Sequence, residues 1–103
     1  MAAMTSIWDR NKLSVEVGLK DDGSLTFSGC DNKGNRDYEY DITVAAADVP
    51  TVLAALPGPP EDDLITRLQW NAEMIITTGE STWLESLGIK TEFWSHGEWT
   101  LFE

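Results

Sequence analysis

The sequence predicts a small α+β domain in which an antiparallel sheet is covered on one face by helices. Three observations indicate this fold class. Apolar and polar residues alternate over residues 13–29, a second alternating stretch occupies residues 38–44, and a helical pattern covers residues 59–79. If the strands form a meander, their apolar faces collect beneath the long helix. The chain has 103 residues and no linker-like segment, so we expect one domain over residues 1–103.

Residues 13–29 show the pattern of a β-hairpin. Apolar side chains recur at every second position from Leu13 to Leu19, the period of a strand with one buried face. The turn at residues 21–24 contains Asp-Gly and reverses the chain, and Leu25 and Phe27 continue the apolar face. Residues 30–37 are rich in turn formers and lead to the third strand. On the opposite side the three strands gather Glu16, Thr26, Ser28, Glu39 and Asp41.

Residues 59–79 are predicted to form one long helix. Two prolines suit its first turn and Gly79 suits its end. Trp70 and Met74 lie one turn apart on the side away from the sheet, so this helix carries a second apolar patch. The stripe expected to face the sheet comprises Leu64, Ile65, Leu68, Ala72, Ile75 and Ile76.

Shorter elements are expected on both sides of the long helix. Asp48 is the expected N-cap of a short helix that ends near residue 57, and residues 80–87 form a second short helix with Ser81 or Thr82 near its cap. Residues 7–10 either begin a strand or cap the sheet. The aromatic tail is expected to form a further strand pair around residues 95–98 or an irregular cover. The predicted architecture is a meander of three or more strands with one long and two short helices on one face.

The charge balance limits the function classes. There are 18 acidic and 7 basic residues, a net charge of −11. This excess argues against direct nucleic-acid binding, which needs clustered Lys and Arg, and favours a basic protein partner. Solubility explains an acidic surface about as well. The chain has no membrane-length apolar run and no signal-peptide pattern, so a cytoplasmic location is expected.

No catalytic, cofactor or metal site is predicted. Cys30 and His96 are the only cysteine and histidine, so neither an internal disulfide nor a Cys/His zinc site can form. A protein-binding surface is favoured because interface cores prefer large rigid aromatic side chains with charged residues around them. Two structural alternatives remain: the tail folds back over the helix and covers its aromatics, and the acidic face is merely solvated. The candidate partner-binding residues are Trp70, Met74, Trp94 and Trp99, the bordering Glu73 and Glu98, and Glu39 and Asp41 on the acidic face.

The succession of segments resembles a known class of small proteins. YEYDITV is followed by DVPTVLAAL, a helix with an acidic start, ESTWLESLGI and an aromatic EFW tail. This layout, over residues 13–94, is similar to that of small acidic immunity proteins that accompany polymorphic or contact-dependent growth-inhibition toxins. The resemblance implies a non-enzymatic cytoplasmic protein that covers the active site or substrate entry of a cognate toxin.

Two other function classes are open. One is a small homodimeric scaffold or regulatory domain that associates through the Trp70 and Met74 face. The other is a hydrolase or a binder of small cationic ligands that uses an aromatic cage.

Overall fold

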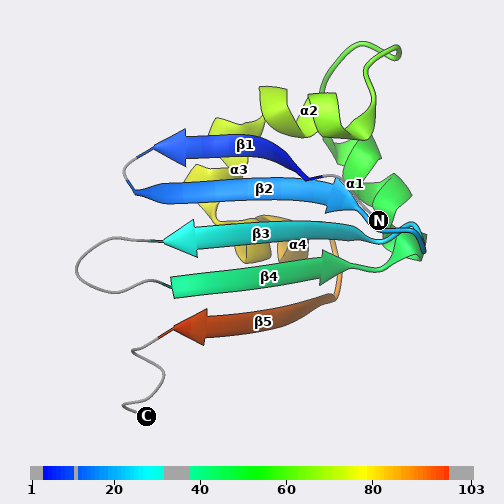
Figure 1. Cartoon of the computed structure of the whole chain (residues 1–103). Helices are drawn as coiled ribbons and strands as arrows, with labels where there is room; N and C mark the ends of the chain where they lie inside the picture. The colour runs from blue at the N-terminus through cyan, green and yellow to red at the C-terminus, as the bar shows by residue number, and fades with distance from the viewer. Residues whose placement is uncertain (1–3, 11, 32–37, 98–103) are drawn as a thin grey trace.

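A computed structural model describes residues 4–10, 12–31 and 38–97 of the chain. Five antiparallel strands form one sheet in the order β1-β2-β3-β4-β5, so each strand pairs with the strand that precedes or follows it (Figure 1). This confirms the predicted α+β meander. The strands are β1 (Thr5–Arg10), β2 (Leu13–Leu19), β3 (Leu25–Asp31), β4 (Tyr38–Val44) and β5 (Thr91–Gly97).

The helices follow β4 and cover one face of the sheet, behind the strands in Figure 1. The described residues leave the other face of the sheet without a covering layer. The helical elements are a 3-10 turn (Ala46–Asp48), α1 (Val49–Ala55), α2 (Leu64–Trp70), α3 (Ala72–Thr78) and α4 (Glu80–Ser86).

The prediction of one long helix over residues 59–79 was wrong. Asn71 separates α2 from α3, with φ −104° and ψ 13°. Its side-chain amide donates to the carbonyl oxygen of Arg67 at 2.8 Å and to that of Pro57 at 3.2 Å. The second bond ties the break to the preceding loop, so contacts outside the helix interrupt a segment whose apolar stripe is continuous.

The start of this segment also differs from the prediction. α2 begins at Leu64, and Asp63 is its N-cap, accepting a hydrogen bond from the Thr66 amide at 2.8 Å. That bond lowers the pKa of Asp63. The prolines belong to a loop whose carbonyls at Leu56, Pro59 and Asp62 accept hydrogen bonds from the Arg67 guanidinium. Because Arg67 supplies these donors, the loop needs no helical bonds.

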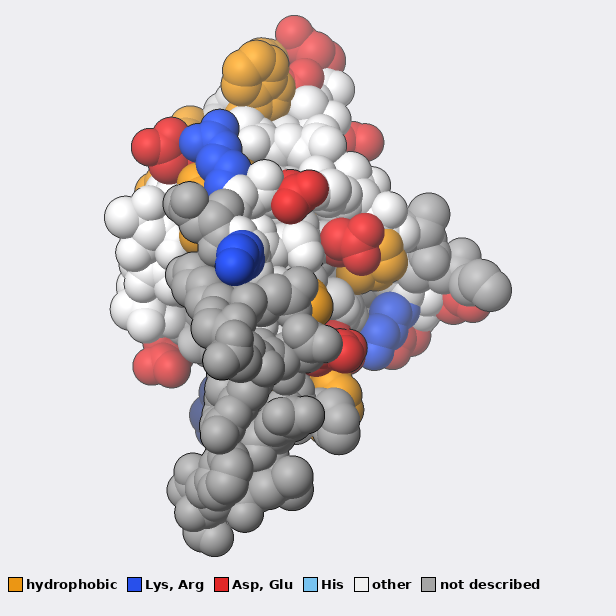
Figure 2. Space-filling model, turned by 60° about the vertical axis from the view of Figure 1, so that its left-hand side comes forward, with side chains coloured by type: hydrophobic (Ala, Val, Ile, Leu, Met, Phe, Trp, Pro, Cys, Tyr) orange, Lys and Arg blue, Asp and Glu red, His pale blue; other side chains and the backbone are white. Residues whose placement is uncertain are grey.

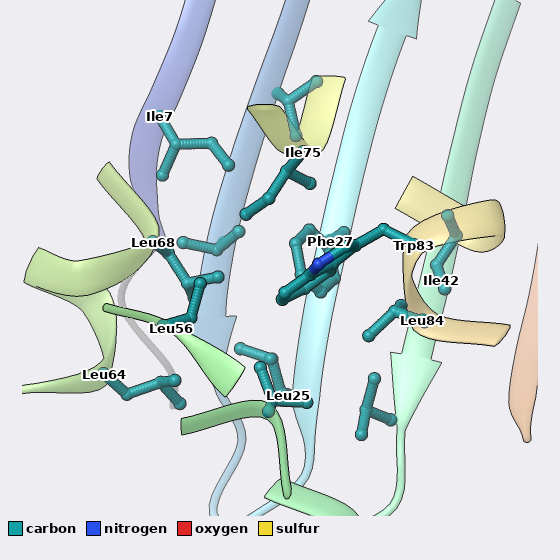
Figure 3. Close-up of a cluster of buried hydrophobic side chains, with 14 of the residues drawn as sticks. Ile7, Leu25, Phe27, Ile42, Leu56, Leu64, Leu68, Ile75, Trp83 and Leu84 are labelled. Carbon is teal, nitrogen blue, oxygen red and sulfur yellow. The ribbon is translucent and has the colours of Figure 1, made fainter. Parts of the chain in front are cut away.

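The core lies between the sheet and the helices (Figure 3). The predicted strand and helix faces meet there, including Phe27 of β3, Ile42 of β4 and Leu68 of α2, each at most 2% exposed. Leu13 and Tyr40 pack at its margin. Ile7, Trp83, Leu84 and Ile89 complete this core.

The two edge strands resolve the ambiguous ends of the chain. Residues 5–10 form β1, with an irregular register between Ser6 and Trp8 that places Ile7 in the core. The tail forms the single strand β5 beside β4, instead of the expected strand pair or irregular cover. α4 begins at Glu80 directly after Gly79, so Ser81 and Thr82 lie inside the helix instead of at its cap.

Gly29 allows the Tyr40 ring to lie across β3. The two residues are cross-strand partners, and a Cβ atom on Gly29 would lie 2.1 Å from Tyr40 Cζ. Gly29→Ala is therefore expected to destabilise the fold by about 1–3 kcal/mol, because the ring must move away from its hydrogen-bond partner Glu80. Urea unfolding measures the change. A double mutant with Tyr40→Leu provides the control, because the penalty should largely disappear when the ring is absent.

Candidate functional site

The sheet face turned away from the helices, here called the open face, carries one row of four residues across four strands. The strand register pairs Glu16 of β2 with Ser28 of β3, Ser28 with Asp41 of β4, and Asp41 with Trp94 of β5. Directly paired residues point to the same face of a sheet. The open face therefore presents an indole and two carboxylates in a line, with Glu39 on the next row.

This row borders a shallow hollow of about 400 Å³. Trp94 is 53% exposed, Glu16 and Glu39 are exposed, and Asp41 is half-buried. The Ser28 hydroxyl donates to Asp41 Oδ1 at 2.5 Å, which fixes the carboxylate against the sheet. No Lys or Arg points to this face among the strand residues that the structure describes. The hollow is thus negative, with one large aromatic side chain at its border.

The predicted acidic face is confirmed, and Trp94 joins it. The sequence placed Glu39 and Asp41 on one solvent-facing side of a strand, and the register shows the same arrangement. It grouped Trp94 with Trp70, Met74 and Trp99 and did not place it beside Glu39 and Asp41. The pairing of β5 with β4 brings Trp94, Glu39 and Asp41 together, and that pairing joins segments separated by all the helices.

The other described candidates lie on the helix layer. Trp70 is the last residue of α2 and is 78% exposed, while Met74 of α3 is 40% exposed and Glu73 is exposed beside it. Trp70 borders an apolar hollow of about 380 Å³ with Pro57 and Pro59. Hydrophobic side chains project at the top of Figure 2, the end of the molecule where α2 lies in Figure 1. The predicted binding residues therefore divide between two surfaces.

The position of the aromatic tail bears on whether Trp70 is covered. Through Gly97, the tail lies along β4 at one edge of the sheet, whereas α2 contacts β1 at the other edge. The described part of the tail thus does not pack over Trp70. Glu98 and Trp99 lie outside the described residues.

The sequence did not single out Glu80 as a site residue. Glu80 is the first residue of α4 and is only 8% exposed, and its carboxylate accepts a hydrogen bond from the Tyr40 hydroxyl. Burial and this bond hold the pKa of Tyr40 far above its ordinary value, so the phenol stays protonated and donates. A Glu at a helix start is ordinarily exposed, and no local pattern marks this one as buried.

Other chemistry finds little support in the described residues. No group of three or more His, Cys, Asp or Glu side chains there is arranged to hold a metal ion, and no helix there has the length and apolarity needed to cross a membrane. Cys30 is half-buried on β3. Comparison of the chain with protein-family models, curated proteins and solved structures finds no match.

Proposed function

We propose that this chain is a non-enzymatic protein-binding module whose open face binds a basic protein. The observation that carries the proposal is the exposed indole of Trp94 beside carboxylates from two strands, β2 and β4, on a face that no described element covers. Trp is the side chain most often responsible for a large share of binding energy when a partner buries it. A rigid sheet holds these groups in place, so the surface loses little conformational freedom on binding.

We further propose that the partner is a toxin and that the chain acts in the cytoplasm as its immunity protein. Enzymes that act on nucleic acids or nucleotides carry basic active sites, and carboxylates of the open face would occupy the positions of substrate phosphates. The acidic composition and the resemblance of the layout to immunity proteins support this partner class. No catalytic group of the chain takes part, because occlusion of the active site is sufficient for inhibition.

The direct experiment is co-expression with the proteins encoded beside this chain's gene, each produced with and without this chain, to find the proposed toxin. Cells that produce the toxin alone should stop growing, and cells that also produce this chain should recover. Trp94→Ala combined with Asp41→Asn should abolish the recovery while the protein still accumulates. Trp70→Ala provides the matched control, because it removes an exposed Trp from the helix layer. Unaltered protection by the double variant would contradict use of the open face.

The net charge predicts a strong effect of salt on the association rate. Between 50 and 500 mM sodium chloride, the association rate constant with the basic partner should fall by roughly tenfold or more, and the dissociation rate constant should change much less. The physical reason is screening of the long-range attraction between a chain of net charge −11 and a cationic surface. Stopped-flow fluorescence measures both rates. An association rate independent of salt would remove electrostatic steering from the mechanism.

The alternative function is a homodimeric scaffold that associates through α2 and α3. It is favoured by one observation, the exposed Trp70 above an apolar hollow. Trp70→Ala should change the free energy of unfolding of the monomer by less than about 0.5 kcal/mol, because the side chain is mostly in solvent. Urea unfolding at low concentration measures this. Sedimentation analysis at increasing concentration then decides between the functions: a dimer that Trp70→Ala dissociates supports the scaffold.

A further inference from the structure

A second hollow, on the helix side of the sheet, combines aromatic rings with the buried carboxylate of Glu80. It has a volume of about 220 Å³ and lies between the start of α4 and the β4-β5 pair. The residues that line it include Tyr38 and Tyr40 of β4, Phe93 of β5, and Ser81 and Thr82 of α4. Because Phe93 and Trp94 are adjacent on one strand, this hollow and the open face lie on opposite sides of the sheet.

The three rings lie next to one another along the edge of the sheet. The centroids of Tyr40 and Phe93 are 6.1 Å apart with an angle of 12° between the ring planes. The centroids of Tyr38 and Tyr40 are 6.0 Å apart, with an angle of 34°. Phe93 is 55% exposed, although a Phe that served only to fill the core would be buried. The rings thus form an aromatic surface that remains open to a ligand.

Glu80 places a negative charge beside this aromatic surface. Glu80 is only 8% exposed, and a buried carboxylate is unfavourable unless charge or hydrogen bonds compensate it. The hydroxyl of Tyr40 provides one hydrogen bond, to Oε2. The residues that line the hollow include no Lys or Arg. Among the described residues, no cationic side chain that lines this hollow therefore offsets the charge of the Glu80 carboxylate.

We propose that this hollow binds an alkylammonium group. The faces of aromatic rings attract cations. A nearby carboxylate adds a full negative charge that an anion or a neutral apolar ligand could not use. The volume, which corresponds to roughly seven water molecules at about 30 Å³ each, accommodates a substituted ammonium group together with part of its alkyl chain. The proposal is independent of the partner proposed for the open face.

The proposal is tested by titrating the full-length protein with tetramethylammonium and choline. Amide chemical shifts of residues 79–82 and 93 are followed at constant ionic strength, with sodium chloride replaced by the probe. Both cations should give saturable shifts. 3,3-Dimethylbutan-1-ol has the shape of choline without its charge and should bind at least tenfold more weakly. Absence of saturable shifts with the cations, or equal binding of the alcohol, would overturn the proposal.

Three variants assign the binding to this hollow. Glu80→Gln preserves an acceptor for Tyr40 but removes the charge, and Phe93→Leu removes an exposed ring, so each should weaken cation binding by tenfold or more. Trp94→Leu alters the other face of the same strand, so it should leave the affinity for tetramethylammonium and choline unchanged, whatever its effect on binding at the open face. Thermal unfolding verifies that each variant is folded. If both Glu80→Gln and Phe93→Leu bound the cations as tightly as the natural protein, the hollow would not be the binding site. The hydrogen bond between Tyr40 and Glu80 would then have a structural role only.

Two further probes identify the source of the ammonium group. N-acetyl-lysine methylamide and its trimethylated form represent a lysine side chain of a protein, whereas choline represents a free small cation. Tighter binding of a lysine probe would indicate a protein side chain as the natural ligand. Tighter binding of choline would indicate a small molecule, and either result supports the site.

Discussion

Phe27→Ala is expected to lower the free energy of unfolding by about 3–5 kcal/mol, the largest effect of a single substitution that we predict. Phe27 lies on the central strand β3, is fully buried, and belongs to the same core cluster as Trp83 and Leu84 of α4 (Figure 3). Truncation removes its apolar contacts and leaves a cavity between the two layers. Because small domains are stabilised by only about 5–15 kcal/mol, much of the total would be lost. Urea unfolding followed by tryptophan fluorescence measures the shift.

Phe93→Ala is the matched control for this prediction. It makes the same chemical change on the same side of the sheet, but Phe93 is 55% exposed and its ring stacks with that of Tyr40. Loss of one aromatic pair at the surface is expected to destabilise by about 0.5–1.5 kcal/mol. If both substitutions had equal effects, the sheet and helices would not form the single core described above.

The strands were predictable because their pattern is local. Alternation over β2, β3 and β4 places Val15, Phe27 and Ile42 on one face, and the structure buries all three. A one-residue change in register would expose each strand's apolar set, so burial of one face specifies the register strongly. The stripe of the predicted long helix was correct for the same reason, since Leu68 and Ile75 are both fully buried.

The interruption at Asn71 was not predictable from periodicity. Asn71 lies in a segment whose apolar stripe continues on both sides of it, and its effect depends on a hydrogen bond to the Pro57 carbonyl, fourteen residues earlier. The loop before α2 likewise depends on Arg67, whose guanidinium donates to three backbone carbonyls. These carbonyls belong to residues in, or just before, the first turn of the long helix that the sequence predicted. Such contacts form only in the folded chain, so they cannot be predicted from the helix propensity of the local sequence.

The candidate surfaces show the same division between local and long-range information. Glu39 and Asp41 were placed correctly because they alternate with apolar residues on one strand. Trp94 reaches them only through the pairing of β5 with β4. Glu80 was missed because its burial results from the approach of α4 to Tyr40, forty residues earlier in the chain. A sequence pattern therefore indicates which face a residue occupies, but not which distant segment completes the site.

If the open face binds the proposed basic partner, Trp94→Ala is expected to weaken that binding by at least about 2 kcal/mol, which is roughly thirtyfold in Kd. The indole is about half exposed in the free protein and is the largest side chain beside the acidic hollow. A partner that covers the open face would bury it against the carboxylate row. The free energy of unfolding should change by less than about 1 kcal/mol, because the side chain is not part of the core.

The most direct measurement is the affinity of the natural protein, Trp94→Ala and Trp70→Ala for the purified toxin domain, by isothermal titration calorimetry. We expect Trp94→Ala to lose roughly thirtyfold or more in affinity and Trp70→Ala to bind within about twofold of the natural protein. The two variants remove the same side chain from opposite layers of the fold. The reverse order, with Trp70→Ala defective and Trp94→Ala unaffected, would contradict the open face as the binding surface.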